Sequence, residues 1–322
     1  MPLKSALSNR KVEMKINEQT LEFIEGIFES NDLNRLPEKY GGDRIFQAPI
    51  IGVAGGDDPI FKKYKDSEVV GPKHMTPQEM WLAGGLPDRD NLKARLRIVS
   101  IVFPYSNEIR EEDKNVAEMP AEIYCVGRNF ANAFKNKVLE QTVEFYKNKG
   151  FQAVGGMISP AFQLNFRDVG EPGFIYAVWS ERHIAFAAGL GTFGLHEGLI
   201  TEAGCNIRLG SVITDAPLEV TPRKSDDPYA NCLHFAGEKC MKCVSRCAGN
   251  ALSEDGHDKV KCYLWGQVVA REMEQRLGPL LKPHHRNIGG KDQKSYPVGC
   301  ALCQFGVPCT SNNPLKNKRS ND

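Results

Sequence analysis

The sequence has almost no excess charge of either sign. Its 322 residues include 41 Lys and Arg against 40 Asp and Glu, which leaves a formal net charge of +1. A chain without a strong overall field is not drawn to nucleic acid or to an anionic membrane by charge alone. Its partners must therefore be recognised locally.

Long apolar stretches are also missing. No run approaches the roughly 18 apolar residues of a membrane-spanning helix. The sequence begins Met-Pro-Leu-Lys-Ser without an apolar targeting core, and no twin-arginine signal follows. We therefore expect a cytoplasmic protein without a membrane partner, in which the thiols stay reduced and disulfides are disfavoured.

Cysteine, in contrast, is concentrated. Eight of the ten cysteines lie in the last third of the chain, in two groups that each contain a C-x2-C pair followed by one further cysteine. In bacterial ferredoxins such a run places three thiolates on one four-iron four-sulfur cluster, while the next cysteine binds the other cluster. The spacing predicts two clusters with crossed ligation.

The predicted ligands follow from this crossing. The first cluster takes Cys232, Cys240, Cys243 and Cys309, and the second takes Cys262, Cys300, Cys303 and Cys247. Ala248 and Thr310 stand where proline normally follows the last cysteine, and five residues separate Cys303 from Cys309 instead of three. Two four-cysteine zinc sites would use the same residue types, although zinc motifs seldom carry the lone cysteine that follows each pair.

The remainder of the chain alternates between strand and helix patterns. We expect strands at 95–103, 151–155, 173–178 and 205–218, and helices at 21–28, from Phe130 to Gly150, from Ser180 to Ala188, and at 262–277. This alternation indicates an α/β fold. We divide it into an accessory segment (1–90), an α/β core (91–222) and a two-cluster domain (223–322).

A glycine-rich stretch follows the helix that ends at Ala188. Gly189, Gly191 and Gly194 satisfy the G-x-G-x-x-G pattern of dinucleotide-binding proteins, and Gly198 follows. The pattern here comes after an expected helix, whereas the dinucleotide motif comes after a strand, so NAD binding is not favoured. The glycines would instead let the backbone approach another group closely.

Several of these segments together resemble one superfamily. The stretch from Ala188 to Gly194, the strand and turn from Arg208 to Leu218, the cysteine groups with Cys262-Tyr-Leu between them, and Tyr124-Cys-Val-Gly-Arg-Asn-Phe130 are similar to the epoxyqueuosine reductases and reductive dehalogenases. The likeness covers roughly residues 95 to 312.

This resemblance implies a nitroreductase-like α/β domain, then a ferredoxin-like domain with two four-iron four-sulfur clusters. A corrinoid (cobalamin) would lie between them, near Gly189, Gly191, Gly194, His196 and Arg128. A flavin is a further alternative.

The sequence departs from the family in two places. The epoxyqueuosine reductases place a catalytic aspartate shortly before the Ala-Gly-Leu-Gly run, whereas the matching segment here, Val178-Trp-Ser-Glu-Arg-His183, has none. Only a short polar tail follows the last cysteine group, where those enzymes carry a helical-repeat extension associated with tRNA. We therefore expect a small-molecule substrate and no tRNA. The run Asp255-Gly-His257 also lacks the glycine that would complete a corrinoid-binding D-x-H-x-x-G motif.

Four residues are candidates for the chemistry. Tyr176, Glu181 and His183 could supply a proton, and we favour His183 because an imidazole ordinarily titrates near neutral pH. Arg208 would hold an anionic group. Three residues also have an interpretation without catalysis: His183 and His196 could have a structural or solvent-facing role, and Glu181 could be a helix N-terminal charge. Cys125 and Cys205 are interpreted as small buried apolar residues.

The predicted function is that of an iron–sulfur oxidoreductase. Electrons from a low-potential donor such as ferredoxin or flavodoxin would pass through two clusters to a corrinoid, for reductive cleavage of a small substrate. The alternatives are an electron-transfer or corrinoid-reducing partner protein without its own reaction, and a flavin-dependent reductase.

Overall fold

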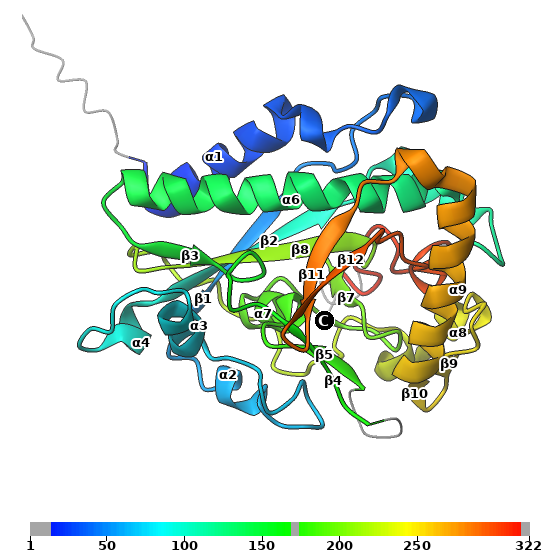
Figure 1. Cartoon of the computed structure of the whole chain (residues 1–322). Helices are drawn as coiled ribbons and strands as arrows, with labels where there is room; N and C mark the ends of the chain where they lie inside the picture. The colour runs from blue at the N-terminus through cyan, green and yellow to red at the C-terminus, as the bar shows by residue number, and fades with distance from the viewer. Residues whose placement is uncertain (1–13, 169–173, 317–322) are drawn as a thin grey trace, which may run out of the picture.

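A four-stranded antiparallel sheet forms the centre of the protein (Figure 1). The computed structural model describes residues 14–168 and 174–316. The strands lie in the order β1 (Ile50–Gly55), β2 (Arg97–Pro104), β8 (Ile207–Thr214) and β3 (Ala153–Gly155). β2 is buried along nearly its whole length, because helices cover both faces of the sheet.

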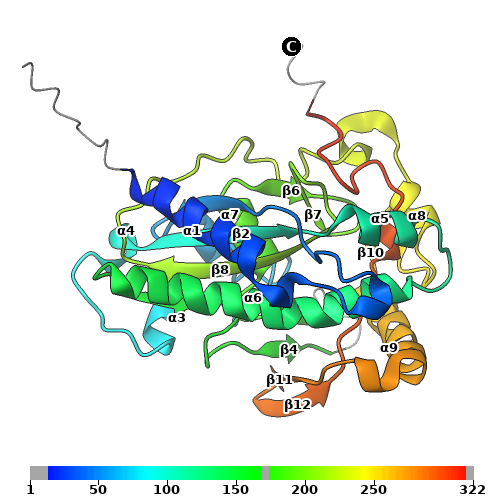
Figure 2. The same ribbon diagram turned by 90° about the horizontal axis from the view of Figure 1, so that it is seen from above.

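The long helix α6 (Glu122–Asn148) covers one face, with α1 (Ile16–Ser30) alongside it (Figure 2). Val99, Ile101 and Phe103 of β2 point into this layer. Phe134 of α6 lies with its ring centroid 5.0 Å from that of Phe28 and 6.2 Å from that of Phe103. The alternation of strand side chains thus assigns one set of apolar residues to α6.

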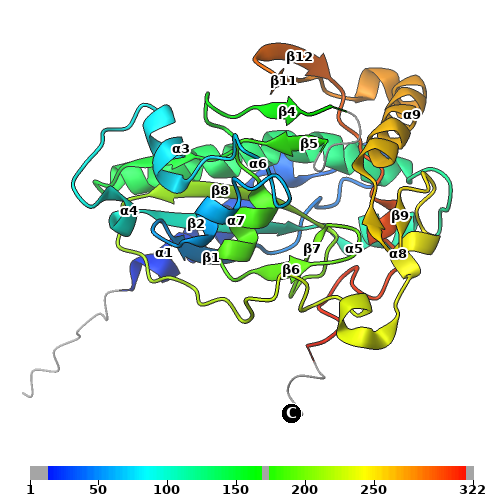
Figure 3. The same ribbon diagram turned by 90° about the horizontal axis from the view of Figure 1, so that it is seen from below.

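The other set of strand residues faces α7 (Glu181–Ala187) and α3 (Pro77–Ala83), seen from below in Figure 3. Ile98 and Val102 of β2 pack here with the buried indoles of Trp81 and Trp179. The indole N–H of Trp179 donates to the hydroxyl of Ser211 in β8, at 2.8 Å. Because that donor is satisfied, Trp179 can be fully buried.

Two smaller strand systems lie beside the central sheet. β4 (Leu164–Phe166) and β5 (Ile175–Ala177) join β11 (His284–Ile288) and β12 (Lys291–Ser295) in the order β12-β11-β4-β5, so that the C-terminal part of the chain pairs with its middle. β6 (Gly191–Phe193) and β7 (Leu199–Thr201) form a hairpin.

The elements that carry the cysteine groups gather at one end of the central sheet (Figure 1). They are η3 (His234–Glu238), α8 (Lys242–Ser245), β9 (Leu252–Ser253), β10 (Gly256–His257), α9 (Lys259–Leu277), η4 (Gly278–Leu280) and η5 (Leu302–Gln304). The guanidinium group of Arg246 ties them to the core by donating to the carbonyls of Asp113 and Val116, at 3.0 and 2.7 Å. The remaining short helices are η1 (Asp32–Asn34), η2 (Glu38–Tyr40), α2 (Ile60–Lys63), α4 (Leu92–Arg95) and α5 (Asn107–Lys114).

Most of the expected elements are present. β2, β3, β5 and β8 fall at the expected strands, and α1, α7 and α9 at the expected helices. Gly173, where one strand was expected to begin, lies outside the described residues. No helix in the described part of the chain is long and apolar enough to cross a membrane.

Three features differ from the sequence-based expectation. The helix expected from Phe130 already begins at Glu122, because Tyr124, Cys125 and Val126 are buried on the same helical face. The mixed α/β composition is as predicted, but the central strands are antiparallel, so this part is not built from parallel βα units. Residues before 91 contribute β1 to the central sheet.

The aromatic layer under α6 provides a test of the core. Phe134 is fully buried, so Phe134→Ala should lower the free energy of unfolding by about 3–5 kcal/mol, through lost transfer energy and a cavity. Phe166→Ala makes the same change where the side chain is 40% exposed, and should cost less than about 1 kcal/mol. Urea unfolding followed by circular dichroism would measure both. Equal losses would contradict this description of the core.

Candidate metal centres and the buried acid

The structure brings the first predicted group of cysteines together. Cys232, Cys240, Cys243 and Cys309 line one hollow, whose remaining wall is largely apolar. Burial, together with the charges of the other three thiols, raises the pKa of Cys243 to about 12. Four thiols in an apolar hollow are poor anions by themselves, but they form a suitable donor set for a four-iron cluster or for zinc.

The second predicted group also converges. Burial is the main cause that raises the pKa of Cys303 well above its ordinary value, and the charges of Cys300, Cys262 and Cys247 follow. Cys262, in the first turn of α9, is exposed, so this group reaches the surface. Cys243 of the first group also contributes to the pKa of Cys303, which indicates that the two groups are neighbours.

The crossed ligand sets predicted from the sequence stay a prediction, on which two observations bear. Cys309 lines the same hollow as the three other cysteines of the first group. Cys247, like Cys243, is among the thiols whose charge raises the pKa of Cys303. The donor set fits two four-iron four-sulfur clusters by number, element and sharing of ligands between the two runs.

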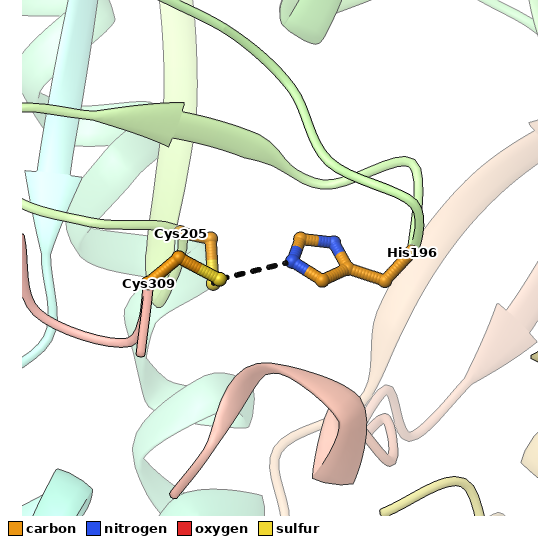
Figure 4. A group of neighbouring side chains, drawn as sticks. All are labelled: His196, Cys205 and Cys309. Carbon is orange, nitrogen blue, oxygen red and sulfur yellow. Dashed lines mark hydrogen bonds between the residues drawn. The ribbon is translucent and has the colours of Figure 1, made fainter. Parts of the chain in front are cut away.

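Cys309 has two further neighbours (Figure 4). Its sulfur lies 3.7 Å from Sγ of Cys205 and 3.6 Å from Nε2 of His196, and the three ligand atoms lie within 4.8 Å of one another. The hydrogen bond from the Cys205 thiol is the main cause that lowers the pKa of Cys309 to about 5, while burial opposes it and the bond to His196 adds to it. Cys205 is thus buried as expected, but it is also a polar neighbour of a predicted ligand.

The space beside the glycines that were expected to approach a corrinoid is filled by other parts of the chain. A Cβ on Gly189 would lie 2.8 Å from the carbonyl oxygen of Pro222, and one on Gly191 would lie 2.3 Å from that of Ile200. A Cβ on Gly194 would lie 3.1 Å from the ring of His196. These contacts account for the glycines without any cofactor.

Glu181 lies in the first turn of α7, and both of its carboxylate oxygens are shielded from solvent. Burial raises its pKa from the ordinary 4.5 to about 7, although the Ser211 hydroxyl and the charge of Lys135 oppose the rise. Lys135 reaches this region from α6, with Nζ 3.1 Å from the sulfur of Met157. An enclosed carboxyl with this pKa can hold a proton at neutral pH and release it.

His183 does not have the properties for which it was favoured. Its Nδ1 lies 2.8 Å from the Ser180 hydroxyl, and its ring packs against Tyr64 and Phe193, with centroids 5.0 and 4.8 Å away. Burial first, and then the charge of Arg182, hold the pKa of His183 well below its ordinary value. The imidazole is therefore neutral at physiological pH, and the reason for choosing it as the proton donor does not hold.

The remaining predicted residues lie in two places. The ring of Tyr176 in β5 is buried beneath the guanidinium group of Arg167, 4.9 Å from its centroid. Arg208 of β8 donates through Nη2 to the side chain of Asn132, one helical turn after Arg128 on α6. Nη1 of Arg208 and Nε of Arg128 are buried without a hydrogen-bond partner among the described residues. Two such groups would suit an anion.

The raised pKa of Glu181 gives a test with a defined sign. At about pH 4 the carboxyl is protonated in both the folded and the unfolded chain; as the pH rises to about 7 the unfolded chain loses its proton first, which lowers the stability of the parent by up to about 3 kcal/mol. Glu181→Gln has no such proton. The stability of the variant relative to the parent should therefore increase between about pH 4.5 and pH 7 and then level off. Urea unfolding at each pH would measure both free energies of unfolding. A constant difference between parent and variant across this pH range would contradict the raised pKa.

Sequence comparisons find no matching family model and no matching curated protein. Comparison of structures finds an epoxyqueuosine reductase from Streptococcus thermophilus, with 13% identity, coverage of 94% of this chain and 69% of the other, and a TM-score of 0.48. Another, solved with an epoxyqueuosine-modified tRNA stem loop, gives 16% identity, coverage of 93% and 69%, and a TM-score of 0.46.

The catabolic reductive dehalogenase NpRdhA, solved with 3-bromo-4-hydroxybenzoic acid, gives 13% identity and a TM-score of 0.45, and the match covers 93% of this chain but 37% of the other. This chain therefore spans about two thirds of the matched reductases and little more than a third of that dehalogenase. The expectation that tRNA is not a substrate stays a prediction. Identities and scores this low carry no argument about function, so the chemistry of this protein has to be argued from its own residues.

Proposed function

We propose that the protein is an iron–sulfur oxidoreductase whose two cysteine groups each hold a four-iron four-sulfur cluster. The observation that supports the proposal is the gathering of the cysteines: Cys309 lines one hollow with Cys232, Cys240 and Cys243, and the charges of Cys300, Cys262 and Cys247 contribute to the raised pKa of Cys303. Shared runs of this kind are typical of two-cluster ferredoxins. Bound clusters would supply one-electron transfer at low potential.

The second group is where an electron donor would meet the protein. Cys262 is exposed, and Leu264, two residues further along α9, is 58% exposed. The first group includes the buried Cys232 and Cys243. A low-potential donor such as ferredoxin or flavodoxin would therefore approach the face that carries Cys262.

Glu181 is the residue to which we assign the proton. Reductive cleavage of a carbon–halogen or carbon–oxygen bond needs a proton at the departing or newly formed centre. With its pKa raised to about 7, Glu181 carries one at neutral pH, whereas His183 is neutral. Arg208 and Arg128, each with an unpartnered buried nitrogen, would hold an anionic group of the substrate. Tyr176 is the remaining candidate donor.

A corrinoid or a flavin has less support from this chain. Gly189, Gly191 and Gly194 are filled by Pro222, Ile200 and His196, and so do not fit the role of a cofactor cradle. We derive no step through either cofactor. An electron carrier without its own reaction is the second candidate, favoured by the enclosure of the Glu181 carboxylate, which has no solvent-exposed oxygen.

Iron and sulfide analysis of anaerobically purified protein tests the clusters. We expect about eight iron atoms per chain, the content of two four-iron clusters. Cys309→Ser should remove the spectroscopic signal of one cluster and Cys247→Ser that of the other, because the two cysteines belong to different groups. Cys125→Ser, which removes a buried cysteine outside both groups, is the matched control and should keep both signals. Stoichiometric zinc, or about four iron atoms in the parent, would contradict the proposal.

Turnover by the reduced protein separates the two candidate functions. The compounds to test are small anions with a reducible carbon–halogen or carbon–oxygen bond, 3-bromo-4-hydroxybenzoic acid among them, and an epoxyqueuosine-modified stem loop, each with and without cobalamin. Glu181→Gln should slow the reaction by about 100-fold or more, the usual contribution of a general acid, and His183→Gln should leave it within a few-fold of the parent.

An equal rate in Glu181→Gln and the parent would place the proton donor elsewhere. Reaction only in the presence of cobalamin would bring the corrinoid into the function. No reaction with any compound, together with rapid reoxidation by an added electron-carrier protein, would favour the electron carrier.

A further inference from the structure

The hydrogen bonds of His196 fix which of its ring nitrogens carries the proton. Its Nδ1 accepts a hydrogen bond from the backbone N–H of Gly198, at 2.9 Å. A neutral imidazole that accepts at one nitrogen carries its proton on the other. Nε2 of His196 is therefore an N–H donor, and it lies 3.6 Å from the sulfur of Cys309 (Figure 4).

The turn between β6 and β7 holds the ring in this position. The backbone N–H of Gly194 donates to the carbonyl of Gly198, at 2.9 Å. A Cβ on Gly198 would lie 2.7 Å from the imidazole and one on Gly194 would lie 3.1 Å from it, so the ring fills the space above both glycines. With 4% of its surface exposed, His196 has little room to turn away.

Cys205 approaches the same sulfur from the other side. Its thiol lies 3.7 Å from Sγ of Cys309, and its backbone N–H donates to the Cys309 carbonyl at 2.8 Å. Gly204, next to it, has a left-handed backbone conformation with φ +81°, and a Cβ there would lie 2.3 Å from the carbonyl oxygen of Thr310. Only glycine brings Cys205 this close.

We propose that His196 is a positioning residue for Cys309, and that with Cys205 it sets the reduction potential of the first cluster. The inference rests on the proposed function, since it requires a cluster on Cys309. A hydrogen bond to a ligand sulfur withdraws negative charge from it and stabilises the reduced, more negative cluster. The first cluster is thereby held at a higher potential than it would have without this donor.

Three variants and one control test the inference. His196→Leu removes the N–H donor. His196→Gln keeps an N–H donor and should therefore restore the reduction potential of the first cluster. Gly198→Ala keeps the imidazole but displaces it, because the new methyl group would lie 2.7 Å from the ring. Gly26→Ala makes the same change on α1, where no atom lies within 4 Å of the new Cβ.

The measurement is a redox titration of the anaerobic protein followed by electron paramagnetic resonance, with iron content determined in parallel. The signal of the first cluster is the one that Cys309→Ser lacks. We expect His196→Leu and Gly198→Ala to shift the midpoint potential of the first cluster to a more negative value. In His196→Gln and Gly26→Ala this midpoint potential should stay closer to that of the parent. The midpoint of the second cluster should be the same in all.

Two results would overturn the inference without touching the proposed function. If His196→Leu keeps its iron and titrates at the parent potential, the hydrogen bond does not set the potential. If His196→Leu and His196→Gln both lose half of the iron while staying folded, His196 is itself a ligand and not a donor. A parent without iron would instead contradict the proposed function.

Discussion

The C-terminal part of the structure depends on how eight thiol groups can be packed close together at one end of the central sheet. The thiols come from separate stretches of the chain, and burial holds the pKa values of Cys243 and Cys303 above their ordinary values. Deprotonating such groups in an apolar hollow is unfavourable unless a positive centre compensates for the lost hydration. Because binding of that centre is coupled to folding, the turns around η5 and α8 and the start of α9 are expected to order together with it.

Strand β8 connects this end of the molecule to the buried acid. It lies between β2 and β3. Cys205 lies two residues before the start of β8, and Ser211, which is beside Glu181, lies six residues after Cys205. At about 3.3 Å per residue the two points are roughly 20 Å apart along the chain. A central strand with partners on both sides is among the most rigid elements of a sheet, so it keeps the sulfur end and the acid end at a fixed separation.

Features that depend on short sequence spacing could be predicted, and features that depend on tertiary contacts could not. The cysteine groups follow from C-x2-C pairs, and β2 from its run of β-branched residues. The low pKa of His183 and the raised pKa of Glu181 arise from burial in the folded protein, where His183, for example, packs against Tyr64, which is distant in sequence. The glycine-rich stretch was recognised, but the close contacts of its glycines with His196, Pro222 and Ile200 appear only in the folded protein.

The two irregularities around Cys309 have one physical explanation. Thr310 stands where proline is usual, and its N–H and hydroxyl both donate to the Val307 carbonyl, at 3.0 and 2.8 Å, while its hydroxyl accepts from the Val307 N–H. Proline has neither donor, so this turn could not form with it. The longer spacing after Cys303 provides the residues that the turn needs, and the turn presents the Cys309 carbonyl to the N–H of Cys205. The departure from the ferredoxin spacing is therefore the same feature that brings Cys309 against His196 and Cys205.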